Sequence, residues 1–311
     1  MRFLSGNQTM EIMPFKNFSY KDVKKIEFPK DENKIEIAWN ITFWCNYNCE
    51  YCFGKKEKSL PKLEAIIKNS IKLNKYIEEQ DKKVHIRLIG GEVTYLPLIK
   101  ILKNLSSKKI YKISLTTNLS RETEYFEELI KYYNNNKYDY SITASLHQTQ
   151  VKDLNDWIEK AKKIATTIQC TVTNENCKES IAILNNIKKD YKGNIKVDVC
   201  RVKNSPINLT DENLNLIKPF FDTSKSYYNI FFNDGRVFNS VSKTELMTKI
   251  DQTNFNGKMC ESNKFRMLED GKVFYGSCHS FLKEGEIKSL KKKAVKCSNT
   301  HCPMCNVLQI F

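Results

Sequence analysis

Three cysteines in one short segment are the residues of this sequence best suited to chemistry. Cys45, Cys49 and Cys52 are separated by three and then two residues. Thiolates are soft ligands that bind zinc or iron–sulfur clusters. A closed structural zinc site takes four ligands, and the next histidine in the chain is His85, so a zinc knuckle would need a distant fourth ligand. Three local thiolates instead fit a [4Fe–4S] cluster whose fourth iron is open to another ligand.

A second group of cysteines lies towards the end of the chain. Its members are Cys260, Cys278, Cys297, Cys302 and Cys305. The first two bracket an Asp-Gly pair at 270–271, which is typical of a hairpin turn and would bring their thiolates together. With Cys302 and Cys305 they make a set of four that fits tetrahedral zinc or a fully ligated [4Fe–4S] cluster. Spacing alone does not separate the two.

A third motif, Gly90-Gly91-Glu92, follows an expected strand at 84–90. Glycine lacks a Cβ atom, so it lets the backbone approach a ligand closely. The neighbouring carboxylate can bind a positively charged amine. A simple turn is the alternative interpretation of these residues.

Alternating strands and helices are predicted to position these motifs. Short apolar runs indicate strands at 35–42, 84–90, 112–117, 138–146, 167–173 and 195–202, and amphipathic patterns indicate helices near 60–79, 94–105, 121–133, 152–165, 178–189 and 211–221. Such a series forms a parallel sheet with helices on its outer face. Six units are too few for a closed barrel of eight strands. The predicted fold class is therefore α/β, with a curved, partly open (β/α)6 barrel that gathers functional groups at the C-terminal ends of its strands.

Three parts are predicted along the chain. Residues 1–34 form a lead-in, 35–222 the α/β core, and 223–311 a small cysteine-rich β-hairpin/α domain. In the last part, Asn233-Asp234-Gly235 and Asp270-Gly271 indicate hairpins, and a lysine-rich stretch at 283–294 indicates a helix. We expect metal binding to stabilise this small domain more than its core does.

The composition excludes several classes of protein. The 311 residues are 41% hydrophobic and 28% charged, which is a globular balance, and no apolar run approaches the roughly 20 residues that span a bilayer. No signal segment precedes the core, so a cytoplasmic location is expected, where disulfides are rare and eleven cysteines indicate metal binding. The net charge of +15 would suit nucleic acid, but the lysines are spread out and no basic run exceeds three residues. We therefore expect neither a membrane nor a nucleic-acid partner.

Together, the motifs resemble those of the radical S-adenosylmethionine (radical SAM) superfamily. The likeness covers 35–220 in pattern, with the three-cysteine loop after the first strand and Gly-Gly-Glu after the second. It implies a [4Fe–4S] cluster on Cys45, Cys49 and Cys52, with an open iron for SAM. The other implied SAM contacts are Gly90, Gly91 and Glu92 at the methionine amine, Tyr51 beside the adenine, Asn118 and Ser145 at the ribose and carboxylate, and Arg201 at a carboxylate of SAM or substrate.

The C-terminal cysteines are similar to twitch and SPASM extensions of that superfamily, which carry auxiliary [4Fe–4S] clusters. The resemblance implies one auxiliary cluster, with Cys297 as a spare or alternative ligand. The implied ligands are Cys260, Cys278, Cys302 and Cys305. A flavodoxin- or ferredoxin-type protein is the implied electron donor.

The implied reaction begins with reductive cleavage of SAM to a 5′-deoxyadenosyl radical, which removes a hydrogen atom from the substrate. We expect oxidation of a small molecule aided by the auxiliary cluster; the alternative is a peptide-modifying enzyme. Some 34 residues precede the first expected strand, fewer than a leader-binding domain needs, which favours the small molecule. No general base for an oxidation is identifiable, although His147 follows the fourth strand where a substrate would lie. A zinc-stabilised, non-enzymatic binding protein is the remote alternative.

Overall fold

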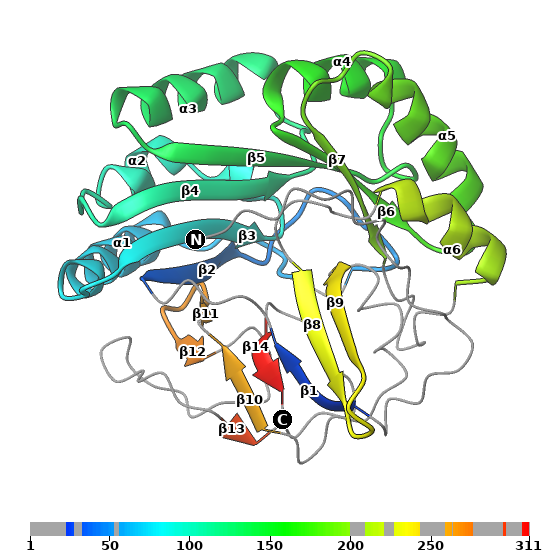
Figure 1. The fold of residues 1–311 in the computed structure, drawn as a ribbon. Coiled ribbons are helices and arrows are strands. Elements are labelled where there is room, and N and C mark those ends of the chain that lie inside the picture. Colours follow the sequence, from blue (N-terminus) through cyan, green and yellow to red (C-terminus); the bar gives the residue numbers. More distant parts are fainter. Residues whose placement is uncertain are drawn as a thin grey trace.

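A computed structural model of the chain describes residues 23–27, 33–52, 56–199, 209–220, 227–242, 259–262, 264–275, 295–296 and 307–310. These residues form an eight-stranded sheet, a set of helices along one of its faces, and a second sheet of six strands. Figure 1 shows the helices as an arc over the larger sheet, with the smaller sheet on the side away from α3 and α4.

The larger sheet has the order β12-β11-β2-β3-β4-β5-β6-β7. Six of its strands are β2 (Lys34–Thr42), β3 (Lys83–Gly90), β4 (Ile110–Thr117), β5 (Asp139–Leu146), β6 (Thr167–Val172) and β7 (Asn194–Val199). Adjacent strands from β2 to β7 pair in parallel. All six predicted strands and the partly open α/β barrel are therefore confirmed.

Helices connect these strands. Each helix packs on the sheet through the apolar stripe on one of its faces. They are α1 (Leu63–Glu78), α2 (Leu98–Leu102), α3 (Thr123–Asn135), α4 (Leu154–Ile164), α5 (Cys177–Lys188) and α6 (Asp211–Ile217), with 3-10 turns at Val93–Tyr95 and Lys218–Phe220. In α4, for example, the Asp153 carboxylate caps the first turn by accepting from the Asp156 backbone N–H at 3.0 Å. Its buried residues Trp157 and Ala161 are spaced one turn apart, so one face meets the sheet.

Part of the C-terminal region also joins this sheet. Strand β11 (Lys264–Met267) pairs in parallel with β2, and β12 (Val273–Tyr275) pairs antiparallel with β11 as the edge strand. Gly271, at the hairpin turn between them, has a φ of +82°, which glycine adopts without strain. The predicted hairpin at Asp270-Gly271 is confirmed, and it adds a seventh parallel strand to the barrel sheet.

The smaller sheet has the order β13-β10-β14-β1-β8-β9 and is antiparallel. Its strands are β1 (Val23–Glu27), β8 (Tyr227–Phe232), β9 (Val237–Ser242), β10 (Met259–Ser262), β13 (Val295–Lys296) and β14 (Val307–Ile310). The hairpin predicted at Asn233-Asp234-Gly235 is confirmed between β8 and β9. Strand β1, from the expected lead-in, lies between β14 and β8.

The predicted domain limits at 34 and 222 remain predictions. Two pairings join residues on opposite sides of these limits. Strand β1, from before residue 34, pairs with β14 and β8 from after residue 222. Strand β11, also from after residue 222, pairs with β2 of the predicted core. The helix predicted at 283–294 lies outside the described residues. Among the helices that the structure describes, none is long and apolar enough to cross a membrane.

Candidate functional site

The three-cysteine loop begins directly after β2, at the C-terminal edge of the parallel sheet. The backbone N–H of Cys52 donates to the carbonyl of Cys49 at 3.2 Å, and the backbone N–H of Tyr47 donates to Cys45 Sγ at 3.4 Å. Cys49 is buried, Cys45 is partly exposed and Cys52 is exposed, and none of the three is in a disulfide. The loop therefore presents three free thiols at the edge where parallel sheets bind ligands.

The thiols suit a cluster with several irons. In the described residues, no three Cys, His, Asp or Glu side chains converge on a point that could hold a single metal ion. A [4Fe–4S] cluster does not require such convergence, because each thiolate binds a different iron. Burial raises the pKa of Cys45 to about 11, so its thiol must lose a proton when it binds metal.

Gly90 and Gly91 pass directly against the start of this loop. Gly91 N–H donates to the Thr42 carbonyl at 2.7 Å, and Glu92 N–H donates to the Trp44 carbonyl at 2.8 Å. A Cβ atom on Gly91 would lie 1.8 Å from the Trp44 oxygen, and one on Gly90 would lie 2.0 Å from the Thr42 oxygen. Only glycine fits at these positions. Gly90 closely approaches the last residue of β2, and Gly91 closely approaches the cysteine loop.

Replacing Gly91 by alanine is therefore expected to move the Trp44 carbonyl and, with it, the adjacent Cys45. The expected result is loss of most of the about four irons of this cluster, measured as iron per chain after anaerobic reconstitution. Gly235→Ala is the matched control, because Gly235 has a φ of +91° but nothing within 4 Å of an added Cβ. Full iron content in Gly91→Ala would show that the loop tolerates the displacement.

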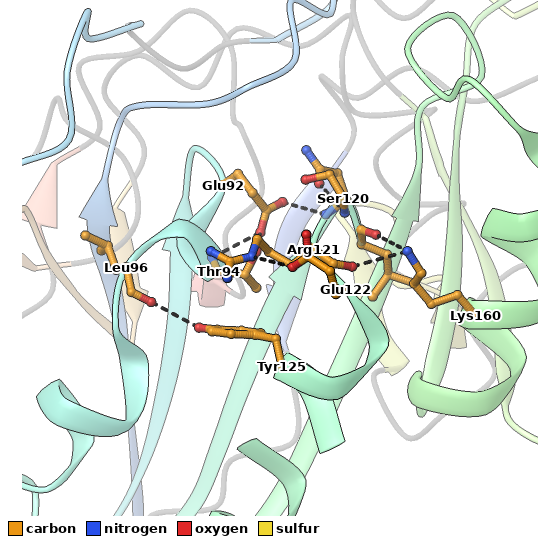
Figure 2. Close-up of polar contacts among 10 residues, drawn as sticks. Glu92, Thr94, Leu96, Ser120, Arg121, Glu122, Tyr125 and Lys160 are labelled. Carbon is orange, nitrogen blue, oxygen red and sulfur yellow. Dashed lines mark hydrogen bonds and ion pairs between the residues drawn. The ribbon is translucent and has the colours of Figure 1, made fainter. Parts of the chain in front are cut away.

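Glu92 is the polar centre of the strand ends. Its side chain is 1% exposed. Oε1 accepts from Thr94 N–H at 3.1 Å, Thr94 Oγ1 at 2.6 Å and Thr117 Oγ1 at 2.8 Å, and Oε2 accepts from Asn118 N–H at 2.7 Å. Burial raises the pKa of Glu92, while these four donors oppose the rise. Figure 2 shows the carboxylate between Thr94 and the loop that carries Ser120 and Arg121.

The loop after β4 is held in a strained conformation. Leu119 is 1% exposed and has a φ of +58°, an unfavourable region for a residue with a bulky side chain. Trp157 Nε1 donates to the Asn118 carbonyl at 2.9 Å, and Lys160 Nζ donates to the carbonyls of Leu119 and Arg121 at 3.4 and 3.2 Å (Figure 2). Helix α4 thus fixes the loop that presents Asn118.

Asn118 also reaches the cysteine loop. Its Nδ2 donates to Asn46 Oδ1 at 2.9 Å, and Asn46 lies between the first two cysteines. Asn118 thereby connects the end of β4 with the cysteine loop and with Glu92. The structure brings together these predicted residues from three different strand ends.

The loop after β5 contacts the other side of the cysteine loop. The Tyr51 hydroxyl is hydrogen-bonded to His147 Nδ1 at 2.8 Å, and the two rings stack with centroids 5.8 Å apart. Asn48 N–H donates to Gln150 Oε1 at 2.9 Å. Burial lowers the pKa of His147 to about 4, so its imidazole is neutral at neutral pH. Ser145 is buried near the end of β5.

Several residues of this site were not identified from sequence. Thr94 and Thr117 bind the Glu92 carboxylate, and Asn46 and Gln150 join the cysteine loop to neighbouring strand ends. The one local signal was the position of Thr94 two residues after Glu92, because a side chain often accepts from the backbone N–H at that spacing, as Glu92 does here. Arg201 and the C-terminal cysteines at 278, 297, 302 and 305 lie outside the described residues, and Cys260 lies on β10.

Comparison with known proteins agrees with this geometry. The sequence profile described as "Radical SAM superfamily" matches residues 39–168, which include the cysteine loop, Glu92, Asn118 and Ser145. Residues 39–168 form a radical SAM domain. The predicted resemblance is therefore confirmed, and the family implies a [4Fe–4S] cluster and SAM as cofactors.

Two curated proteins are similar to this chain. One is the S-adenosylmethionine-dependent nucleotide dehydratase of Psychrobacter lutiphocae, 31% identical over 31% of this chain and 37% of its own length. The other is the radical SAM cyclopropyl synthase TigE of Paramaledivibacter caminithermalis, 22% identical over 74% of this chain and 50% of its own length. The chain thus spans half or less of the length of these curated relatives.

Solved structures show the same fold. The anSMEcpe protein, with bound AdoMet and Cp18Cys peptide, has a TM-score of 0.54 at 18% identity, covering 83% of this chain and 78% of that one. SuiB of Streptococcus suis bound to the precursor peptide SuiA has a TM-score of 0.50 at 14% identity, covering 83% and 63%. At these identities the likeness concerns the fold alone.

Proposed function

We propose that the chain is a radical SAM enzyme that cleaves S-adenosylmethionine and removes a hydrogen atom from its substrate. The observation that carries this proposal is the placement of three free thiols beside Glu92 and Asn118 at one edge of the parallel sheet. When bound, the cluster supplies the electron that splits SAM into methionine and a 5′-deoxyadenosyl radical. A flavodoxin or ferredoxin is the proposed source of that electron.

The protein residues bind and orient SAM. Cys45, Cys49 and Cys52 are the proposed cluster ligands, and Tyr51, fixed by His147, would lie beside the adenine. Glu92 supplies negative charge for the methionine amine. Its four donors occupy about as many positions as a carboxylate offers, so direct contact with the amine would replace one of them. Asn118, Ser145 and Arg201 are the proposed partners of the ribose and carboxylate.

The proposed reaction is an oxidation aided by an auxiliary [4Fe–4S] cluster. The adenosyl radical takes a hydrogen atom and becomes 5′-deoxyadenosine, and the substrate radical then loses one electron and one proton. The proposed auxiliary ligands are Cys260, Cys278, Cys302 and Cys305, with Cys297 as the alternative. Four thiolate ligands would leave no iron open to substrate, so the auxiliary cluster would supply only an acceptor for the electron.

The topology of the smaller sheet supports this ligand set. Cys260 pairs with Val295 of β13 on one side and with Ile310 of β14 on the other. The segment 297–306, which contains three cysteines, connects these two flanking strands. Lys296, which precedes Cys297 in the chain, pairs with Met259, and Cys297 remains the alternative ligand.

Replacing Cys302 and Cys305 together by alanine is expected to separate the two half-reactions. Formation of 5′-deoxyadenosine should continue, because the cluster at the cysteine loop is untouched, while oxidised product disappears. Both are measured by chromatography of the same anaerobic reaction. The double variant Cys170→Ala, Cys177→Ala is the matched control, because both thiols are buried and neither is a proposed ligand. Oxidised product at the wild-type rate in the double variant would contradict an electron-accepting auxiliary cluster.

Peptide modification is the second candidate. The observation in its favour is that anSMEcpe, whose fold matches 83% of this chain, was solved with a bound peptide. The discriminating measurement is the mass of the product: a peptide that loses hydrogen or gains a crosslink in the presence of SAM identifies the peptide reaction.

A further inference from the structure

The inner face of the parallel sheet, meaning the face turned away from the helices, is polar. Parallel sheets are ordinarily buried on both faces and apolar on both. Side chains alternate along a strand, and in β2 the residues Ile35, Ile37, Trp39 and Ile41 all belong to the core under the helices. Glu36, Ala38 and Asn40 therefore face inward. A polar inner face is expected where the barrel encloses a polar ligand.

Two arginines flank one alanine on this face. Arg87 of β3 and Arg266 of β11 are both the register partners of Ala38, one from each side of β2. Neighbouring strands are about 4.8 Å apart, so the two arginine Cα atoms are separated by about 10 Å. Only a methyl group projects between them, and the two guanidinium groups share one layer of the barrel.

The protein holds both side chains on the inner face. Arg87 Nη1 is 3.0 Å from Glu36 Oε1, and Arg266 Nε donates to Asn40 Oδ1 at 2.6 Å. The Arg87 side chain is 37% exposed, which indicates that it borders space open to solvent. At positions 36, 38 and 40 of β2 and their partners 87 and 266, two guanidinium groups face one carboxylate. The two guanidinium groups thus lie level with one another on either side of Ala38.

We propose that Arg87 and Arg266 bind an anionic group of the substrate, a carboxylate or a phosphate. Guanidinium groups offer planar pairs of N–H donors that match both anions. Ala38 lies four residues before Thr42, so this layer is about 13 Å below the strand ends. The substrate would extend along the barrel, with its anionic end at the arginines and its reacting carbon at the edge beside the cysteine loop. The position of the reacting carbon rests on the proposed function, whereas the anion site does not.

Glu36 separates a binding role from a purely structural one. If Arg87 serves only to pair with Glu36, then Glu36→Gln leaves the site no better at binding anions. If the arginines form an anion site, the Glu36 carboxylate competes with the ligand. Glu36→Gln should then strengthen anion binding, while Arg87→Gln and Arg266→Gln weaken it.

The test uses the full-length reconstituted protein without SAM, titrated with sodium phosphate or sodium acetate at constant ionic strength. Binding is measured from the increase in unfolding temperature, because a ligand of the folded state stabilises it by mass action. We expect the apparent Kd of the preferred anion to rise roughly tenfold or more in Arg87→Gln and in Arg266→Gln, and to fall in Glu36→Gln. Arg236→Gln is the matched control, because Arg236 pairs with Asp234 at the exposed β8–β9 turn.

The two titrations also identify the ligand. Stronger stabilisation by phosphate indicates a phosphorylated substrate, and stronger stabilisation by acetate indicates a carboxylate. Equal stabilisation of the wild type and both arginine variants by either anion, or weaker binding in Glu36→Gln, would overturn the proposal. SAM cleavage is not measured in this experiment, so its outcome is independent of the proposed function.

Discussion

Replacing Cys45, Cys49 and Cys52 together by alanine is expected to abolish SAM cleavage and to leave about four of about eight irons. The three residues are all of the proposed protein ligands of this cluster. Without them no iron would remain in the loop after β2 to bind SAM. The remaining irons would be those of the proposed auxiliary cluster on the C-terminal cysteines. The measurements are iron per chain, the absorption band of the cluster, and 5′-deoxyadenosine formed in the presence of a strong reductant.

The matched control for this variant is Cys170→Ala with Cys177→Ala. Both thiols are buried at 0% exposure, one in β6 and one in α5, and neither is near a cysteine-loop residue in sequence. The control should keep all of the iron and the SAM cleavage. Zinc in the wild-type protein in place of iron, or SAM cleavage in the triple variant, would contradict the assignment of the loop.

Replacing Glu92 by alanine is expected to have the second largest effect. The change leaves four donors, two of them backbone N–H groups, without their acceptor in a buried place. Each unsatisfied buried group costs about 1–3 kcal/mol, so the unfolding midpoint in denaturant should fall clearly. Loss of the charge and of the ordered loops should also weaken SAM binding roughly 10- to 150-fold, measured by equilibrium dialysis.

Two further variants separate the roles of Glu92. Thr117→Val removes one donor to Glu92 and the acceptor of the Leu119 N–H. It keeps the carboxylate, so it should lower stability with little loss of SAM affinity. Glu122→Ala is the exposed control in the next loop, because its side chain is 72% exposed and should change neither quantity. SAM affinity at the wild-type level in Glu92→Ala would show that Glu92 does not contribute to SAM binding.

The sequence alone determined the elements that carry the site. Strands at 35–42 and 84–90 were predictable because each is a short run rich in apolar residues, one ending at the cysteine loop and the other at a glycine pair. The confirmed hairpins at Gly235 and Gly271 were predictable because each glycine follows an aspartate. Asp-Gly pairs are common in tight hairpin turns, where the glycine adopts a positive φ. These signals are local, since each depends on a few consecutive residues and on the periodicity of one element.

Only the tertiary structure decided which distant residues meet. Position 91 must be glycine because the Trp44 carbonyl leaves no room for a Cβ atom. The Glu92 carboxylate accepts from Thr117 at the end of β4. The Tyr51 hydroxyl is hydrogen-bonded to His147, which follows β5. No periodicity contains such contacts, because they arise from the order and register of strands that lie far apart in the chain. The same holds for β11, which the sequence placed in a separate C-terminal domain but which hydrogen-bonds to β2. That pairing brings Arg266 level with Arg87, because register across a sheet is set by the packing of whole elements.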